Sequence, residues 1–357
     1  MKVTVKDYLN VRLGKPSLNA PSYQYLAPGS ILDVDGNLYK GEVFEGSDNW
    51  LKDEAGNYYW AGGFDFAPDL PGYEKSWYLA DFGIPQIWDT TKGEGVEVIL
   101  LDSGILVKNI NQPGTITEHT VLSNDITDTL GHGTAMFSII KGNKGFLGIA
   151  PSVNLQSIKL TKKAGFNSSD FINALLLLKK IIKVDKQYVV NCSFAIENCP
   201  EDSKQTIQEH ILELNKGNNI VFCSAVGNFF ANSKTVPAGL NGVISVAGIK
   251  KENDKYKRLV SNNYWDSISL VCPGKFDLSA LQTQFTELPF EGSSHACAYA
   301  TGLIALICSL RLRNGKKTSY GEMATTVKEI TLDPLNLKDS TSPVLNKKKL
   351  LTKINNL

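Results

Sequence analysis

The sequence lacks several features that would point directly to a function. No run of about 18 apolar residues occurs in the 357-residue chain, so a membrane-spanning helix is not predicted. The N-terminal segment has no apolar core of about 7–15 residues, so a signal peptide is not predicted either. With 37 basic and 36 acidic residues, the net charge of +1 gives no reason to expect nucleic acid or an anionic membrane as a partner.

Cysteine pairs typical of a zinc site are also missing. None of the six cysteines forms a C-x-x-C pair, so a zinc knuckle is not expected. Most of them lie inside apolar runs, which favours buried reduced thiols over a disulfide framework and predicts a cytoplasmic protein. The six are Cys192, Cys199, Cys223, Cys272, Cys297 and Cys308.

The first 68 residues differ in composition from the rest of the chain. They are rich in Gly, Tyr, Trp, Asn and Asp, and turn signals such as Asp35-Gly36 and Ala55-Gly56-Asn57 recur at intervals of about ten residues. This pattern predicts a small all-β barrel over residues 1–68. A linker over 69–76 follows, and residues 77–357 form a second domain.

In the second domain, apolar strands alternate with helical segments. Near-continuous apolar stretches at 96–102, 188–194, 219–227 and 242–249 are typical of buried parallel strands. Helices are predicted over 170–184, 203–217 and 296–312, with Ser168, Ser169 and Ser203 as candidate N-caps. The alternation predicts an α/β domain in which helices flank a parallel sheet, with ligand sites at the carboxyl ends of its strands.

Polar residues beside these apolar runs are those that a nucleophilic hydrolase requires. Asp102 ends the first strand, His132 lies between two glycines, and Ser294 directly precedes the apolar helix. A serine hydroxyl needs a histidine base, and a buried carboxylate fixes the tautomer of that histidine. Asn228 follows the third strand, where its amide could donate to the oxyanion of a tetrahedral intermediate.

Each residue alone has a structural explanation, because Asp after a strand is often a turn residue and Ser before a helix is often a cap. The order Asp, His, Ser is more informative, since it is the chain order of one known triad lineage. An α/β-hydrolase esterase needs Ser first and a G-x-S-x-G elbow, whose last glycine position here holds Ala296. A cysteine protease is disfavoured because no cysteine lies in a nucleophile motif.

The segments "VEVILLDSGI", "GHGTAMFSII", "SAVGN" and "GSSHACAYATG" resemble the aspartate, histidine, oxyanion-asparagine and nucleophile motifs of subtilisin-like serine proteases (subtilases, peptidase family S8). The resemblance covers about residues 77–355. It implies a serine endopeptidase with Asp102, His132 and Ser294 as its triad and Asn228 as oxyanion donor. Ala135 replaces the second histidine of the histidine motif, and Ala298 replaces the proline of the nucleophile motif; neither performs chemistry in the family.

The same resemblance implies where a protein or peptide substrate binds. An extended peptide would lie beside residues 191–195, with an apolar pocket for an uncharged side chain before the scissile bond. Ala195 stands where the family usually has glycine. The chemistry requires no cofactor and no metal is assigned, because no acidic loop is dense enough to place a structural calcium ion. The two pocket walls are Ser193, Phe194 and Ala195, and Ala225, Val226 and Gly227.

Residues 1–66 resemble a bacterial SH3-like (SH3b) barrel through "LNVR" and "NWLK…GNYYWAGG". Aromatic residues such as Trp50, Tyr58, Tyr59 and Trp60 belong either to its core or to a peptide groove. Three roles follow from the resemblance: recruiting substrate, docking a partner protein or covering the active site. The alternative for the whole chain is a catalytically silent, subtilase-like scaffold that binds peptides.

Overall fold

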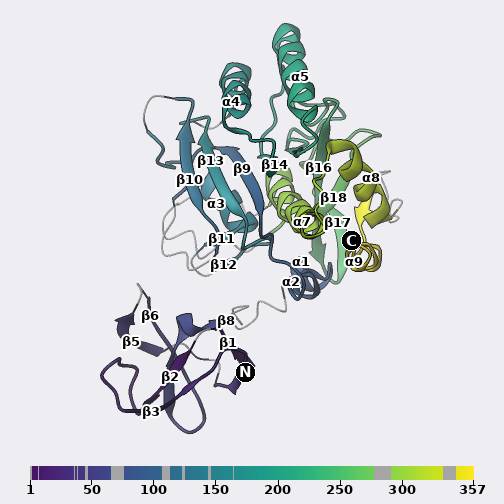
Figure 1. Ribbon diagram of the computed structural model, residues 1–357. Helices are drawn as coiled ribbons and strands as arrows, with labels where there is room; N and C mark the ends of the chain where they lie inside the picture. The colour runs from purple at the N-terminus through teal and green to yellow at the C-terminus, as the bar shows by residue number, and fades with distance from the viewer. Residues whose placement is uncertain are drawn as a thin grey trace. The chain divides into compact units, whose positions relative to one another are not determined.

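The computed structural model describes residues 2–357 apart from 7, 36, 38, 45–46, 66–75, 107–112, 123–124, 144–145, 164, 277–290 and 333–342. The chain divides into two compact units, Met1–Ser76 and Trp77–Leu357 (Figure 1). The predicted linker, residues 69–76, lies outside the described residues except for Ser76.

The first unit is all-β, as its composition predicts. Two antiparallel sheets, in the orders β4-β1-β8 and β3-β2-β7-β6-β5, enclose a core that includes Val5, Val11 and Leu51. Trp50 and Tyr59 are buried, whereas Tyr58 and Trp60 are half-buried. The strands are β1 (Lys2–Val5), β2 (Leu9–Leu13), β3 (Ser22–Leu26), β4 (Ile31–Asp33), β5 (Tyr39–Phe44), β6 (Ser47–Lys52), β7 (Asn57–Trp60) and β8 (Phe64–Asp65).

The second unit is built on a ten-stranded sheet with the order β10-β13-β9-β14-β15-β16-β18-β20-β19 and β17 paired to β16. Its pairings are parallel from β10 to β20, but β17 and β19 pair antiparallel, so the predicted parallel sheet is in fact mixed. The strands are β9 (Val96–Asp102), β10 (Ile116–Thr120), β13 (Asn154–Lys159), β14 (Gln187–Cys192), β15 (Ile220–Ala225), β16 (Val243–Glu252), β17 (Lys255–Arg258), β18 (Leu270–Pro273), β19 (Thr331–Leu332) and β20 (Val344–Leu345).

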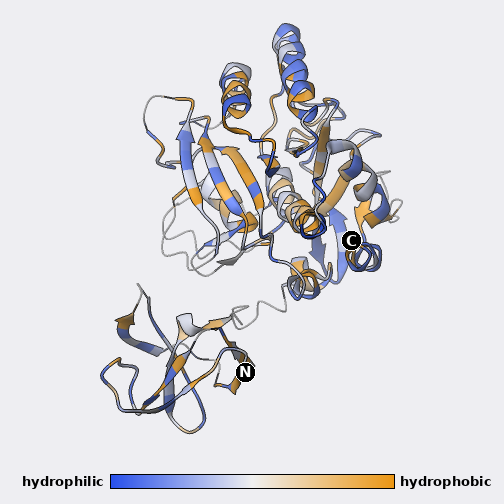
Figure 2. Ribbon diagram, viewed as in Figure 1, coloured by the Kyte–Doolittle hydropathy of each residue, from blue (hydrophilic) through white to orange (hydrophobic). Residues whose placement is uncertain are grey.

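Helices cover both faces of this sheet, which explains why β9 is apolar and buried throughout. Side chains alternate along β9, and Ile99 and Leu101 pack in one core cluster with α4 and α5. The opposite face, which includes the Asp102 position, is covered by α3 and α7. Figure 2 shows β9 largely orange and the edge strand β10 largely blue. The helices are α3 (His132–Ile140), α4 (Ser168–Ile181), α5 (Glu201–Asn215) and α7 (Ser293–Arg313).

Shorter elements complete the unit. They are α1 (Trp77–Ala80), α2 (Ile84–Trp88), α8 (Tyr320–Ile330), α9 (Lys347–Asn355) and the two-stranded pair β11 (Gly142–Asn143) and β12 (Phe146–Leu147). Helix α7 is long and apolar enough to cross a membrane by composition alone. However, 89% of its most apolar window is buried inside this unit, so it is the central helix of the core.

The predicted beginnings of the helices need correction. Asn167, not Ser168 or Ser169, caps α4, because its side chain accepts a hydrogen bond from the Asp170 N–H at 2.8 Å. Helix α5 begins at Glu201, after Pro200, without a side-chain cap, so Ser203 lies inside the helix. Helix α7 begins three residues before the predicted start, which places Ser294 in its first turn.

Candidate active site

The predicted site residues come from segments that meet at the carboxyl ends of the parallel strands. Asp102 is the last residue of β9, His132 the first of α3, and Ser294 the second of α7, while Asn228 follows β15. A cleft of about 160 Å³ opens there. It is lined by His132, Phe166, Ser193, Phe194, Ala195, Ala225, Gly227, Asn228, Phe229, Ser293 and Ser294.

Asp102 and His132 form a hydrogen-bonded pair beside the cleft. The ring Nδ1 of His132 donates to Asp102 Oδ1 at 2.8 Å, and the Ser103 N–H donates to the same oxygen at 2.8 Å. The Asp102 carboxylate is fully buried, whereas a quarter of the His132 side chain is exposed in the cleft. Burial by itself lowers the pKa of His132, but the charge of Asp102, its hydrogen bond and the charge of Asp128 outweigh burial and raise that pKa.

Two glycines let His132 approach Asp102. Gly131 has a φ of 82°, in the left-handed region that glycine adopts without strain. A Cβ at Gly133 would lie 2.0 Å from the carbonyl oxygen of Gly104, just after β9. The flanking glycines therefore bring the start of α3 close to the end of β9.

Asp128 is a buried residue that the sequence analysis did not identify. Its Oδ1 accepts hydrogen bonds from Ser103 Oγ (2.9 Å) and from the N–H groups of Leu130 (3.0 Å) and Gly131 (2.9 Å). Its Oδ2 accepts from the Thr134 N–H (2.9 Å) and Oγ1 (2.6 Å). Asp128 thus holds both the loop before His132 and the first turn of α3. A local signal existed, because Asp commonly bonds backbone N–H groups two or three residues ahead.

Ser294 and Ser193 connect the start of α7 to the end of β14. Ser294 Oγ donates to the carbonyl oxygen of Ser193 at 2.7 Å, and Ser193 Oγ donates to the carbonyl oxygen of Ser294 at 2.9 Å. The hydroxyl of Ser294 is therefore not hydrogen-bonded to His132 in the described part of the chain, although both side chains line the same cleft. It must rotate about its Cα–Cβ bond to use His132 as a base.

Asn228 is held in one orientation by two donors. Its Oδ1 accepts from the Ser293 N–H at 3.0 Å and from Asn262 Nδ2 at 2.8 Å. Asn262, which is fully buried, is itself oriented by the Gly248 N–H, which donates to its Oδ1 at 2.6 Å. Consequently Asn228 Nδ2, which has no hydrogen-bond partner among the described residues, remains available at the cleft. Asn262 was not identified from the sequence.

The walls of the cleft differ from the prediction in three residues. Val226 is fully buried, its N–H bonds to the Val246 carbonyl oxygen at 3.0 Å, and it does not line the cleft. Phe166 and Phe229, which were not predicted, do line it. The ring of Phe166 stacks on Phe194 with centroids 4.5 Å apart and lies edge-on to the His132 ring at 6.4 Å.

Comparison with known proteins assigns this arrangement to a family. Residues 93–340 match the profile described as the Subtilase family. The chain is 28% identical over 240 residues to an intracellular serine protease of Paenibacillus polymyxa. The aligned residues cover 63% of this chain and 70% of the relative. It is 25% identical over 252 residues to a subtilisin-like protease of Coccidioides posadasii. Here the aligned residues cover 69% of this chain and 59% of the relative.

The solved structure of the prenylagaramide maturation protease PagA shares the fold, with a TM-score of 0.61 and 21% identity over 76% of this chain and 98% of that one. The family profile spans more than half of the sequence. The chain therefore belongs to the subtilase family, and its enzyme class is that of a serine protease. The match begins at residue 93, so the likeness of the first unit to an SH3-like barrel stays a prediction.

Proposed function

We propose that the protein is an endopeptidase in which Ser294 is the nucleophile, His132 the general base and acid, and Asp102 the residue that orients His132. The observation that carries the proposal is the 2.8 Å hydrogen bond between His132 Nδ1 and the buried Asp102 carboxylate, at a cleft that Ser294 also lines. This bond leaves Nε2 of His132 as the nitrogen that can accept a proton.

The chemistry is acyl transfer to serine and then to water. Ser294 Oγ attacks the peptide carbonyl carbon, and its proton passes to His132 Nε2. The tetrahedral oxyanion accepts hydrogen bonds from Asn228 Nδ2 and from the Ser294 N–H, both without partners among the described residues. His132 then protonates the leaving amine as the acyl-enzyme ester forms. It next takes a proton from a water that attacks the ester carbon, and gives that proton to Ser294 Oγ as the acid is released.

A protein or peptide substrate would add as an extended strand beside Ser193, Phe194 and Ala195. The side chain preceding the scissile bond would enter between this segment and the segment of Ala225 and Gly227. A Cβ at Gly227 would lie 3.1 Å from the Ala195 methyl and 2.9 Å from the Phe229 ring, so the space between the walls is narrow. We therefore propose an uncharged residue at this position and a narrow range of substrates.

A fluorophosphonate probe tests the nucleophile, because it reacts covalently with an activated serine. We expect labelling of the wild-type chain, no labelling of Ser294→Ala, and normal labelling of the matched control Ser203→Ala on α5. Peptide hydrolysis should follow the same pattern. Absence of both labelling and hydrolysis in the folded wild-type chain would instead support the peptide-binding scaffold.

We also propose that this chemistry needs no cofactor and takes place in the cytoplasm. All six cysteines are free and five are buried, which suits a reducing compartment. Exhaustive chelation should leave kcat unchanged, and a lower melting temperature after chelation would reveal structural calcium. Probe labelling of fractionated cells should be found in the soluble internal fraction, and labelling in the medium alone would contradict this location. A partner protein docked on the first unit remains a further proposal.

A further inference from the structure

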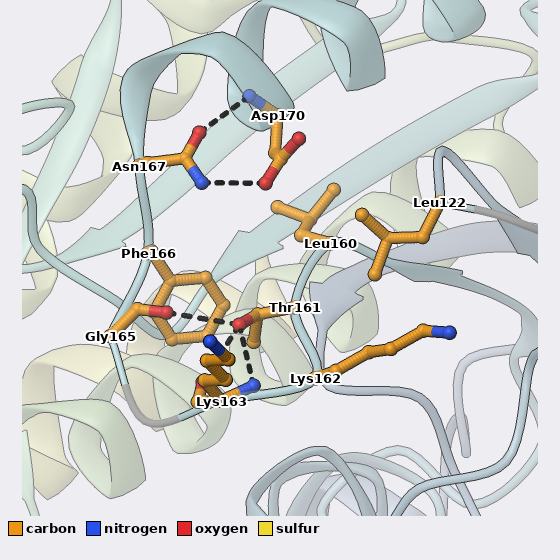
Figure 3. A pocket seen from close by; sticks show the side chains of 9 residues that line it. All are labelled: Leu122, Leu160, Thr161, Lys162, Lys163, Gly165, Phe166, Asn167 and Asp170. Atoms are coloured by element: carbon orange, nitrogen blue, oxygen red, sulfur yellow. Dashed lines mark hydrogen bonds between the residues drawn. The ribbon is translucent and has the colours of Figure 1, made fainter.

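Two polar residues lie beneath the start of α7 and away from the surface of the cleft. Phe166 lines the cleft and also an open groove of about 600 Å³ beside it (Figure 3). Asn191 and Thr301 are not among the described residues that line either space, and both are fully buried. Because a buried polar group costs free energy unless it is hydrogen-bonded, the partners of these two side chains indicate what they hold in place.

Asn191 faces α7 from the sheet. On β14, Val190 and Cys192 belong to the core cluster that α4 and α5 cover. Since side chains alternate along a strand, Asn191 points to the opposite face, where α7 contacts β14. Its Oδ1 accepts from Thr301 Oγ1 at 2.9 Å and from Cys297 Sγ at 3.5 Å. These donors lie in the second and third turns of α7, so Asn191 fixes the helix against the sheet.

The amide nitrogen of Asn191 extends this contact to Ser294. Asn191 Nδ2 donates to Ser193 Oγ at 2.8 Å. Ser193 Oγ lies 2.9 Å from the carbonyl oxygen of Ser294 and 3.2 Å from Asn191 Oδ1. A hydroxyl has a single proton, and Asn191 Oδ1 already accepts from Thr301, so Ser193 donates its proton to Ser294. The hydrogen bonds therefore form one network that joins the side chain of Thr301 to the backbone of Ser294.

This network holds α7 at two points on one side. Ser294 and Thr301 are seven residues apart, about two helical turns, so both face β14. Holding both points fixes the position of the helix along its axis and its rotation about that axis. The Ser294 hydroxyl donates to the Ser193 carbonyl oxygen at 2.7 Å, so its resting position depends on the same contact.

We propose that Asn191 and Thr301 are positioning residues, which act through Ser193 to set the place of Ser294 relative to His132. The inference rests on the proposed endopeptidase function and adds to it two residues that touch neither the substrate nor the reacting atoms. Their role is geometric: the backbone of Ser294 stays fixed while its hydroxyl rotates toward His132.

Thr301→Val tests the far end of the network, because valine has a similar shape but no hydroxyl donor. We expect the rate constant of fluorophosphonate labelling and kcat for peptides to fall together by about threefold to tenfold, since a slightly displaced nucleophile is aligned less often. KM and the midpoint of the acid limb should be unchanged, because the cleft walls and the pair of Asp102 and His132 are untouched. Thr301→Ser retains the hydroxyl and should keep both rates near wild type.

Asn191→Asp tests the middle of the network. It places an oxygen where Nδ2 donates, so the proton of Ser193 turns to the new carboxyl group and the Ser294 carbonyl oxygen loses its donor. We expect labelling and kcat to fall at least as far as in Thr301→Val. If Asn191→Asp does not fold, the comparison of Thr301→Val with Thr301→Ser decides alone.

Two matched controls remove buried hydroxyl donors that do not reach Ser294. Ser309→Ala removes the donor to the carbonyl oxygen of Glu94 (2.7 Å) at the far end of α7. Thr326→Val removes the donor to the carbonyl oxygen of Glu322 (3.0 Å) within α8. Both controls should keep the wild-type labelling rate even if their unfolding free energy falls, because rates are compared on folded protein.

The outcomes separate this inference from the proposed function. If the wild-type chain is labelled and hydrolyses peptides, but Thr301→Val and Asn191→Asp are labelled equally fast, the network is only structural and the endopeptidase function stands. A fall that Thr301→Ser or Ser309→Ala shares also overturns the positioning role. If the wild-type chain is not labelled and hydrolyses no peptide, both proposals are overturned.

Discussion

The pKa of His132 determines the acid limit of the proposed reaction, because only the neutral imidazole can accept the proton of Ser294. Burial lowers this pKa. The charge of Asp102, its hydrogen bond and the charge of Asp128 raise the pKa by more than burial lowers it, so the net direction is upward. Activity should therefore fall as the pH drops through a value above the ordinary pKa of about 6.5 for histidine.

Asp128→Asn should move this acid limit to lower pH. The variant removes a buried negative charge that favours the imidazolium, so the pKa of His132 falls. The measurement is the acid limb of the pH profile of kcat/KM, which reports groups of the free enzyme. Asp185→Asn is the matched control, because Asp185 is exposed and precedes β14 at the amino ends of the strands. An unchanged midpoint in a folded Asp128→Asn variant would mean that Asp128 has only a structural role.

Asn262→Asp should lower kcat and leave KM nearly unchanged. The new carboxylate can still accept from the Gly248 N–H, but it cannot donate to Asn228 Oδ1 as Asn262 Nδ2 does. Repulsion between two oxygens then favours rotation of the Asn228 amide, which removes its N–H groups from the oxyanion. We expect a fall in kcat of about tenfold or more, since an oxyanion donor acts only when charge develops. Asn263→Asp is unsuitable as a control, because Asn263 also bonds the loop that carries Asn228. Asn241→Asp on the surface serves as the control instead. Equal kcat values for wild type and Asn262→Asp would contradict the positioning role.

The sequence was sufficient for some residues and insufficient for others. Asp102, His132, Ser294 and Asn228 could be proposed because each stands in a short motif beside a strand or helix end, and the structure brings the segments that carry them together. Asn262 could not, since its contact with Asn228 spans 34 positions and nothing in its own segment indicates it. Val226 was misplaced because residues beside a lining residue can point to the other face of the backbone.

Helix α3 ends at an unusual lysine. Lys141 is fully buried, and its ammonium donates to the carbonyl oxygens of Pro113 (2.6 Å), Pro151 (3.0 Å) and Val153 (2.7 Å). Burial lowers the pKa of Lys141 to about 8. This side chain ties two segments, at Pro113 and at Pro151 to Val153, to the end of the helix that begins with His132.

Lys141→Met should destabilise the unit that contains it by about 3 kcal/mol, because three buried carbonyl groups lose their donor at once. The measurement is the free energy of unfolding by denaturant at pH 7.5. Lys180→Met, on the exposed surface of α4, is the control and should change stability by about 0.5 kcal/mol or less. A loss for Lys141→Met as small as that of the control would show that water replaces the ammonium.

The same pair of proteins should respond differently to pH. Because burial favours the neutral amine, the folded chain binds fewer protons than the unfolded chain between about pH 8 and 10.4, the unfolded pKa. The unfolding free energy contributed by this residue therefore rises with pH across that window. Wild type should gain about 2 kcal/mol over Lys141→Met between pH 7.5 and 9.5. If the difference in unfolding free energy between wild type and Lys141→Met instead shrinks with rising pH, the three carbonyl groups favour the ammonium over the amine.

Elements were predictable where their pattern was strong. The buried strands β9, β14, β15 and β16 follow from apolar runs that both sheet faces cover. Helix starts were less predictable, since Asn167 competes with nearby serines as a cap and Pro200 begins α5 without one. The antiparallel strand β17 was missed because its turn, Asn253 and Asp254, uses positive φ values (51° and 59°) without a glycine.

At the scale of the whole molecule, the chain contains two units with separate cores. The first unit packs its own buried apolar residues between two small sheets, and the second packs its helices on a ten-stranded sheet. The described residues that line the cleft all belong to Trp77–Leu357. The proposed chemistry therefore uses side chains of the second unit, and recruiting substrates, docking a partner and covering the site stay predictions for the first unit.

A chain that begins at residue 77 distinguishes these roles. We expect it to fold, to be labelled by the fluorophosphonate probe at Ser294, and to hydrolyse short peptides with kcat/KM within about twofold of the full chain. The reason is that short peptides occupy only the cleft, and the core that positions them lies in the second unit. A protein substrate that the first unit recruits should be cleaved more slowly by the shortened chain, since linking two binding sites raises the effective concentration of the second. If short-peptide hydrolysis instead rises severalfold, the first unit covers the active site, and its removal relieves inhibition.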